Sequence, residues 1–294
     1  MSLTGILFNI TAARSDKKRD SLISLPEGIR EFRDISYGPH ADASLLDVYI
    51  PKGVSGKLPT IVSIHGGGYV YGYVYGSKEI YRRYGMDMAR RGFAFVNFNY
   101  RLAPKWKFPA PLADTGAVLE WVIQNQRKYH LDPDRIILLG DSAGAQLTSH
   151  YAAIATNPDF AALFPIKVPE VNIRAVGLFC GMYDIPKFAV GSHKGLANDY
   201  LGRKFDMTDP RLDVLGHIAE AFPPAFVITS CCDFLHDAAE PMFDFLTAKG
   251  IEAEYHCYGT PEAKEVGHVF HVNIIHPEAV KCNDDAAAFF RKYV

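Results

Sequence analysis

A serine between two glycines is the first candidate for chemistry, in the pentapeptide Gly140-Asp-Ser-Ala-Gly144. The apolar residues 136–139 before it are typical of a strand buried on both faces, and apolar residues at helical spacing follow it. Strand, tight turn and helix are the setting in which G-x-S-x-G forms a nucleophile elbow, with glycine where a side chain would crowd the backbone. The pattern predicts that Ser142 is a nucleophile; the alternative is a serine that caps a helix.

Three glycines, in the stretch His65-Gly-Gly-Gly68, follow an earlier predicted strand at residues 58–64. Acyl transfer develops negative charge on a carbonyl oxygen, and backbone N–H groups aimed at that oxygen stabilise the charge. Gly67, Gly68 and Ala143, which directly follows the serine, are therefore the candidate oxyanion-hole donors. Alone, the glycine run indicates only a flexible turn. Its position ahead of the elbow favours the functional interpretation.

A carboxylate and an imidazole are expected after the nucleophile, in the order Asp or Glu and then His. Asp233 follows the predicted strand 225–231, so that it lies at a carboxyl end of the sheet as Ser142 does. Asp237 is the competitor and suits the start of the next helix, where a carboxylate interacts well with the helix dipole. Asp184, after the preceding strand, is the third candidate for the acid.

The candidate base is His268, in the loop between a predicted strand at 251–258 and the last helix. His271 is its nearest rival in the same loop. His256 falls within the strand, and His276 directly precedes the predicted final helix. A single histidine is more often structural than catalytic, but the predicted fold requires a base in this loop.

Two opening strands and then alternating strands and helices predict an α/β fold, with a mostly parallel sheet, helices on both faces and a helical cap. Linkers and internal repeats are missing from the sequence, which indicates one domain over 1–294. The predicted strands cover residues 32–37, 46–50, 58–64, 93–99, 136–139, 175–180, 225–231 and 251–258. The predicted helices after the first strand cover residues 77–91, 109–129, 238–249 and 277–293, together with the helix that follows the serine.

Two segments are candidates for the cap. Residues 1–30 predict one or two amphipathic helices whose apolar side, with Leu3, Ile6, Leu7 and Ile10, needs a partner; a lid over a pocket is one position, and docking far from any site is the other. Residues 186–216 interrupt the alternation, and an insertion of this kind is expected over the carboxyl ends of the strands, where ligands bind.

Tyrosines at positions 69, 71, 73 and 75 follow the glycine run. Two interpretations stand level: the rings line an aromatic pocket for the substrate, or they pack against the cap. Tyr69 and Tyr71 are the candidates for substrate binding.

Composition excludes several classes of function. The chain has 294 residues and a formal net charge of −2, which gives no electrostatic case for binding nucleic acid or an anionic membrane. Apolar stretches are too short for a spanning helix, and the N-terminus lacks a secretory signal. The five cysteines have no metal-type spacing, and their odd number favours reduced thiols and a cytoplasmic protein.

Seven motifs together resemble those of the hormone-sensitive-lipase-like branch of α/β-hydrolase esterases, from about residue 45 to the C-terminus. Their combination is highly specific. They are His65-Gly-Gly-Gly68, Tyr100-Arg-Leu-Ala-Pro104, Phe108-Pro-Ala-Pro-Leu-Ala-Asp114, Asp132-Pro-Asp-Arg135, Gly140-Asp-Ser-Ala-Gly144, Asp233-Phe-Leu-His-Asp237 and His268-Val-Phe270.

The resemblance implies hydrolysis of small carboxylic esters, possible pairing of two chains as a homodimer, and a cap built from the two segments above. It implies no metal and no organic cofactor. The roles that it implies are a catalytic triad of Ser142, Asp233 and His268 and an oxyanion hole formed by Gly67, Gly68 and Ala143.

Two positions depart from the motifs of this family. Lys105 replaces the usual acidic residue after Tyr-Arg-Leu-Ala-Pro, and Val269 stands where glycine is common after the histidine. Neither belongs to the implied triad.

Two alternative functions are compatible with the same sequence: an amidase or peptidase with the same triad, and a non-catalytic ligand receptor on the esterase scaffold.

Overall fold

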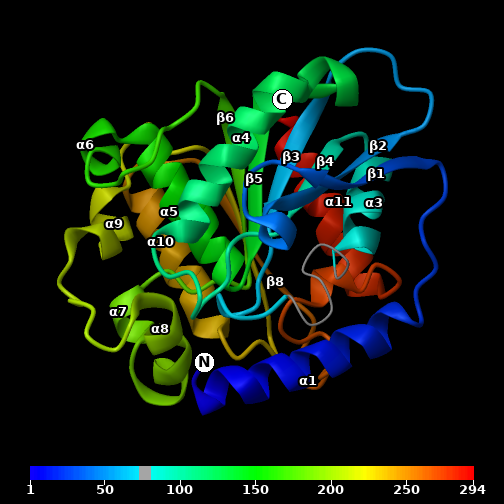
Figure 1. Ribbon diagram of the computed structural model, residues 1–294. Coiled ribbons are helices and arrows are strands. Elements are labelled where there is room, and N and C mark those ends of the chain that lie inside the picture. The colour runs from blue at the N-terminus through cyan, green and yellow to red at the C-terminus, as the bar shows by residue number, and fades with distance from the viewer. Residues whose placement is uncertain (73–80) are drawn as a thin grey trace.

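The computed structural model describes residues 1–72 and 81–294. Within these residues, eight strands form one sheet in the order β1-β2-β4-β3-β5-β6-β7-β8 (Figure 1). β2 is antiparallel to β1 and β4, and all other neighbours are parallel, which confirms the mostly parallel sheet. The strands are β1 (Ile29–Ser36), β2 (Leu45–Pro51), β3 (Leu58–Ile64), β4 (Ala94–Phe98), β5 (Leu131–Asp141), β6 (Ile173–Phe179), β7 (Ala225–Ser230) and β8 (Ala253–Tyr258).

Helices cover both faces of the sheet, as the sequence predicts (Figure 1). α4 (Ala110–Tyr129), α5 (Ala143–Thr156) and α10 (Ala239–Ala248) pack on one face, while α3 (Arg82–Arg90) and α11 (Pro277–Arg291) pack on the other. The remaining helices are α1 (Leu3–Asp20), α6 (Pro158–Ala161), α7 (Ile185–Phe188), α8 (Lys194–Leu201) and α9 (Val214–His217). Short 3₁₀ turns are η1 (Ala41–Ser44), η2 (Gly191–His193), η3 (Pro210–Leu212), η4 (His236–Ala238) and η5 (Phe270–Val272).

The apolar run in β5 explains why this strand is central. Ile136 and Leu138 lie in the core shared with α4, α5 and α10, while Ile137 and Leu139 lie in the core shared with α3 and α11. All four side chains are fully buried. Because successive side chains of a strand point to opposite faces, only a strand covered on both sides needs such an uninterrupted run.

The N-terminal helix does not bury the side that its sequence predicts. Leu3, Ile6, Leu7 and Ile10 of α1 are all exposed, so the expectation that this apolar side meets a partner in the fold is wrong. The buried positions of the helix include Gly5 and Asn9. A side chain at Gly5 would collide with Asp199 of α8, and Asn9 Nδ2 donates to the carbonyl oxygen of Val70 at 3.2 Å. Close approach and hydrogen bonding therefore decide the orientation of this helix, rather than apolar area.

Candidate active site

The turn around Ser142 has the strained backbone of a nucleophile elbow. β5 ends at Asp141, α5 begins at Ala143, and Ser142 between them has φ 55° and ψ −120°. A Cβ atom at Gly140 would collide with the carbonyl oxygen of Gly144, and one at Gly144 would collide with that of Ile64. Both flanking glycines are therefore required by backbone packing, for the reason that the sequence predicts.

Three side chains from different elements form one hydrogen-bonded chain. Ser142 Oγ lies 2.9 Å from His268 Nε2, and His268 Nδ1 lies 2.8 Å from Asp233 Oδ1. Asp233 follows β7, and His268 lies in the loop between β8 and η5. Because an ionised carboxylate only accepts hydrogen bonds, Nδ1 carries the imidazole proton and Nε2 is free to accept the proton of the serine. The structure thus brings together the three residues that the sequence predicts for the triad.

Asp233 keeps its charge although its side chain is completely buried. Burial raises the pKa of its carboxyl, but the hydrogen bond and charge of His268, the amide of Leu235 and the thiol of Cys180 outweigh burial and lower the pKa overall. The Leu235 amide donates to Asp233 Oδ1 at 2.7 Å. A carboxylate that stays ionised is suited to orient the imidazole and to stabilise its protonated form.

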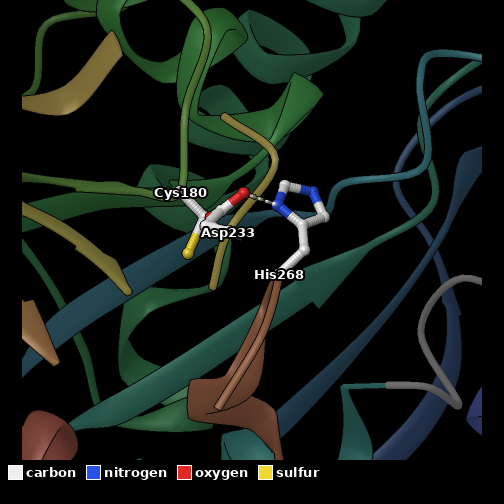
Figure 2. A group of neighbouring side chains, drawn as sticks. All are labelled: Cys180, Asp233 and His268. Atoms are coloured by element: carbon white, nitrogen blue, oxygen red, sulfur yellow. Dashed lines mark hydrogen bonds and ion pairs between the residues drawn. The ribbon is translucent and has the colours of Figure 1, made fainter. Parts of the chain in front are cut away.

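Cys180 is a neighbour of this site that the sequence analysis did not single out. It directly follows β6, is fully buried, and lies next to Asp233, which bonds to His268 (Figure 2). Burial and the charge of Asp233 raise the pKa of its thiol well above the ordinary value, so the thiol keeps its proton. One ligand atom each of Cys180, Asp233 and His268 lies within 4.8 Å of the others, an N, O, S set of the kind that holds zinc. In this structure Asp233 and His268 are hydrogen-bonded to each other, and the Cys180 thiol helps to stabilise the Asp233 carboxylate.

The glycine loop is tied to the elbow by Tyr81. The Tyr81 hydroxyl donates to Asp141 Oδ2 at 2.8 Å and accepts from the amide of Gly66 at 3.1 Å. Burial raises the pKa of the Asp141 carboxyl to about 7. A Cβ atom at Gly66 would lie 2.6 Å from Asp141 Oδ2 and 3.2 Å from the Ser142 Cβ. The loop that carries two of the predicted oxyanion donors therefore lies directly against the serine turn.

A cavity of about 360 Å³ opens beside the serine, and Gly68 and Ala143 line it together with Ser142. Its remaining wall is mostly apolar, and α1 and the segment 185–201 supply part of it. These remaining lining residues are Thr4, Phe8, Tyr69, Met182, Phe188, His193, Leu196, Phe234 and Leu235. A second cavity of about 350 Å³ shares Met182, Phe188, His193, Phe234 and Leu235 with the first, so the two adjoin along one wall.

The two tyrosines proposed for substrate binding have different surroundings. Tyr69 lines the cavity, stacks on Tyr200 with ring centroids 3.8 Å apart, and donates its hydroxyl to Gln146 Oε1. Tyr71 donates its hydroxyl to Asp16 of α1 at 2.8 Å and packs edge-on against Phe8. Tyr71 thus holds the N-terminal helix. The tyrosines at 73 and 75, and the first residues of the helix predicted over 77–91, lie outside the described residues.

The rival histidines lie elsewhere. The ring of His271 is fully buried and meets Tyr84 and Phe179 edge-on, and burial lowers its pKa to about 3. His256 lies 3.5 Å from Glu254 on β8, and the side chain of His276 accepts the amide of Glu278 at the start of α11. Each of these three imidazole rings therefore has contacts away from Ser142.

The rival carboxylates also have other partners. Asp237 is fully exposed and pairs with the neighbouring His236, at the start of the short turn that leads into α10. Asp184 caps α7 by accepting the amide of Lys187 at 2.9 Å. Among the described residues, Asp233 is the carboxylate that hydrogen-bonds to His268.

The two departures from the family motifs also have local explanations. The Lys105 ammonium lies 4.1 Å from the centre of the Trp106 ring, a cation–π contact that an acidic residue would lose. Val269 has φ 59°, a left-handed conformation that glycine adopts without strain. The preference for glycine at position 269 in the family thus has a backbone reason, and this chain tolerates the strain.

Comparisons with known proteins agree with this geometry. The family model described as BD-FAE matches residues 46–243. Carboxylesterase NlhH of Mycobacterium tuberculosis is 28% identical over 245 residues, covering 78% of this chain and 73% of that protein. The ethyl acetate hydrolase of Pseudomonas putida is 25% identical over 204 residues, covering 66% and 62%. Esterase B from Lactobacillus Rhamnosis superimposes with a TM-score of 0.86 at 25% identity, covering 97% and 92%, which confirms the α/β-hydrolase fold.

Among the described residues, no helix has the length and apolar character needed to cross a bilayer.

Proposed function

The chain belongs to the BD-FAE family and is a carboxylic ester hydrolase, and we propose that it cleaves small short-acyl esters through an acyl-enzyme formed on Ser142. Its resemblance to hormone-sensitive-lipase-like esterases is confirmed by the carboxylesterase relatives. The observation that carries the proposal is the hydrogen-bonded chain from Ser142 through His268 to Asp233, with distances of 2.9 and 2.8 Å.

In the proposed mechanism Ser142 Oγ attacks the ester carbonyl carbon while its proton passes to Nε2 of His268. Asp233 holds the ring through Nδ1 and stabilises the imidazolium. The imidazolium then gives its proton to the departing alcohol, which leaves an acyl group on Ser142. Water, activated by the same imidazole, releases the acid and restores the serine.

We assign the oxyanion to the amides of Gly67, Gly68 and Ala143. Two observations support this assignment: Gly68 and Ala143 line the cavity that contains Ser142, and the preceding Gly66 packs against the Ser142 Cβ. Removal of one such donor typically costs about 3 kcal/mol of transition-state stabilisation.

The size and lining of the cavity support compact, apolar substrates. Its volume of about 360 Å³ lies near the lower end of ordinary ligand pockets, and its wall is largely aliphatic and aromatic. Tyr69 contributes its ring to this wall, which favours a role for it in substrate binding. A longer acyl chain would have to use the adjoining cavity or displace α1.

Residues 1–30 and 186–216 form the cap in this proposal, within a single domain over 1–294. Support comes from Thr4 and Phe8 of α1 and from Phe188, His193 and Leu196, all of which line the cavity. A cytoplasmic location and pairing into a homodimer stay predictions. Light scattering of the purified protein measures the second of these directly.

Hydrolysis of para-nitrophenyl acetate, butyrate and octanoate tests the proposal, with Ser142→Ala as the control. We expect turnover of acetate and butyrate well above that of the variant, and a fall toward octanoate. Burst release of nitrophenol, in an amount equal to the enzyme, would support the acyl-enzyme. Cleavage of a para-nitroanilide but of none of the esters would favour an amidase. Tight binding of an ester without turnover would favour a receptor.

A further inference from the structure

Two thiols lie together at the ends of neighbouring strands, close to the proposed triad. Cys231 directly follows β7 and Cys257 lies near the end of β8, and their Sγ atoms are 3.3 Å apart. Cys257 is exposed and Cys231 is half-buried, so small reagents can reach the pair. A disulfide needs about 2.05 Å between its sulfur atoms. The remaining gap of just over an ångström is small enough for side-chain movement to close.

Residues 230 and 231, at the end of β7, hydrogen-bond to the loop that carries His268. After β8 this loop runs over 259–269. The Cys231 thiol donates to the carbonyl oxygen of Gly259 at 3.2 Å, where the loop begins. The Ser230 hydroxyl donates to the carbonyl oxygen of Gly267 at 3.2 Å, where the loop ends. Ser230 and Cys231 therefore anchor both ends of the loop.

Cys232 contacts the same loop at the next residues. Its thiol lies 3.4 Å from the carbonyl oxygens of Thr260 and Pro261. Asp233 is the next residue along the chain. Three consecutive side chains thus contact the histidine loop directly before the carboxylate that pairs with the histidine. A change in bonding at Cys231 therefore acts two residues before Asp233 and, through the Gly259 hydrogen bond, at the first residue of the loop that carries His268.

From this arrangement we propose that Cys231 and Cys257 form a reversible disulfide by exchange with a small-molecule disulfide, and that the bond slows ester hydrolysis by releasing the histidine loop from Cys231. The effect on hydrolysis rests on the function proposed above. Formation of the bond does not.

The exchange proceeds in two balanced steps. The Cys231 thiolate attacks a small disulfide, forms a mixed disulfide and expels one small thiolate. Cys257 then loses its proton and attacks Cys231 Sγ, which closes the protein disulfide and expels the second small thiolate. The two protein thiols lose two electrons and two protons in total, and the small disulfide becomes two thiols. Burial and the Cys231 thiol raise the pKa of Cys257 to about 12, so Cys257 stays protonated and is not the thiol that attacks first. The Cys231 thiol no longer raises the pKa of Cys257 once the mixed disulfide has formed, because that thiol has then been consumed.

Closing the bond has a definite structural consequence. Cys231 loses the S–H group that donates to the carbonyl oxygen of Gly259, and its sulfur moves toward Cys257. The histidine loop then loses the hydrogen bond to the carbonyl oxygen of Gly259, while the contacts of Ser230 with Gly267, of Cys232 with Thr260 and of the Gly259 amide with Glu278 stay in place. We expect kcat for ester hydrolysis to fall roughly fivefold, as for the loss of one hydrogen bond, and to recover fully when dithiothreitol reduces the disulfide.

The test incubates the full chain with oxidised glutathione, blocks remaining thiols with N-ethylmaleimide and maps the tryptic peptides by mass spectrometry. We expect a crosslink between Cys231 and Cys257 that dithiothreitol reverses. Cys232→Ser is the matched control and should still form it, whereas Cys257→Ser should not. A glutathione adduct that persists in the wild type, or a crosslink that requires Cys232, would overturn the proposal.

Activity is read separately. Cys257→Ser keeps the Cys231 donor, so its basal hydrolysis should equal that of the wild type and should not respond to oxidised glutathione. Full activity of the crosslinked wild type would refute the coupling to the loop. If the enzyme hydrolyses no ester before oxidation but forms the crosslink with oxidised glutathione, the proposed function is refuted and the disulfide is supported.

Discussion

The hydroxyl group of Tyr81 lies between Asp141 and Gly66, donating to the carboxylate oxygen at 2.8 Å and accepting the amide at 3.1 Å. One side chain therefore connects the strand end that carries the nucleophile with the loop that carries two proposed oxyanion donors. Asp141 Oδ1 has no hydrogen-bond partner among the described residues, so the carboxyl group is held through Oδ2, which accepts from this hydroxyl.

Tyr81→Phe should lower both stability and turnover. The variant takes the hydrogen bonds of the Tyr81 hydroxyl away from a buried carboxyl and a buried amide, which costs about 1–3 kcal/mol of unfolding free energy. Loosening of the glycine loop should lower kcat more than it changes KM. Urea unfolding and steady-state kinetics measure the two effects. Tyr84→Phe is the matched control, because the buried Tyr84 hydroxyl has no hydrogen-bond partner among the described residues; an equal loss in both variants would contradict this role of Tyr81.

Asp141 should make stability depend on pH between about 4 and 7. Its pKa is raised from 3.8 to about 7 by burial, so the folded protein binds this proton more tightly than the unfolded chain does. Its contribution is therefore most favourable below about pH 4 and declines as the pH rises toward 7. Relative to Asp141→Asn, the wild type should lose on the order of a few kcal/mol across that range. Urea unfolding at a series of pH values tests this, and a constant difference between the two proteins would refute it.

Asp233→Asn should abolish most of the turnover while the fold stays intact. An amide in place of the carboxylate favours the wrong imidazole tautomer, and the loss in a comparable triad is about 10⁴-fold in kcat. Asp237→Asn removes a carboxylate from the same segment that is fully exposed and should change kcat little. Circular dichroism confirms folding of both variants. The assignment of the acid fails if the effects are reversed.

Phe8→Ala should change substrate preference without changing the chemistry. Phe8 of α1 lines the cavity beside Ser142, and loss of its ring removes apolar contact with a short acyl chain. We expect KM for the butyrate ester to rise about threefold to tenfold, with kcat nearly unchanged and longer esters better accepted. Leu7→Ala alters the adjacent, exposed residue of the same helix and should leave the profile as it is. Equal effects at both positions would indicate general disturbance of α1.

The local chemistry of the sequence determined the nucleophile turn and the sheet. The apolar run 136–139 predicts a strand covered on both faces, and glycines at 140 and 144 predict a turn too tight for side chains; both follow from period and size, which are local properties. Because parallel strands end at one edge of the sheet, the order serine, aspartate, histidine left few candidates for the acid and the base, and the family motifs favoured Asp233 and His268 among them.

Only the tertiary structure decided which side chains support these three. Cys180 and Tyr81 carry no motif and lie far along the chain from the residues they contact, so no spacing reveals them. The orientation of α1 was predicted wrongly for the same reason: its apolar stripe is visible in the sequence, whereas the hydrogen bond from Asn9 to Val70 and the close approach at Gly5 depend on surfaces that fold next to it. The periodicity of a segment shows which of its sides could be buried. It contains no information about which other segment packs against it in the folded protein.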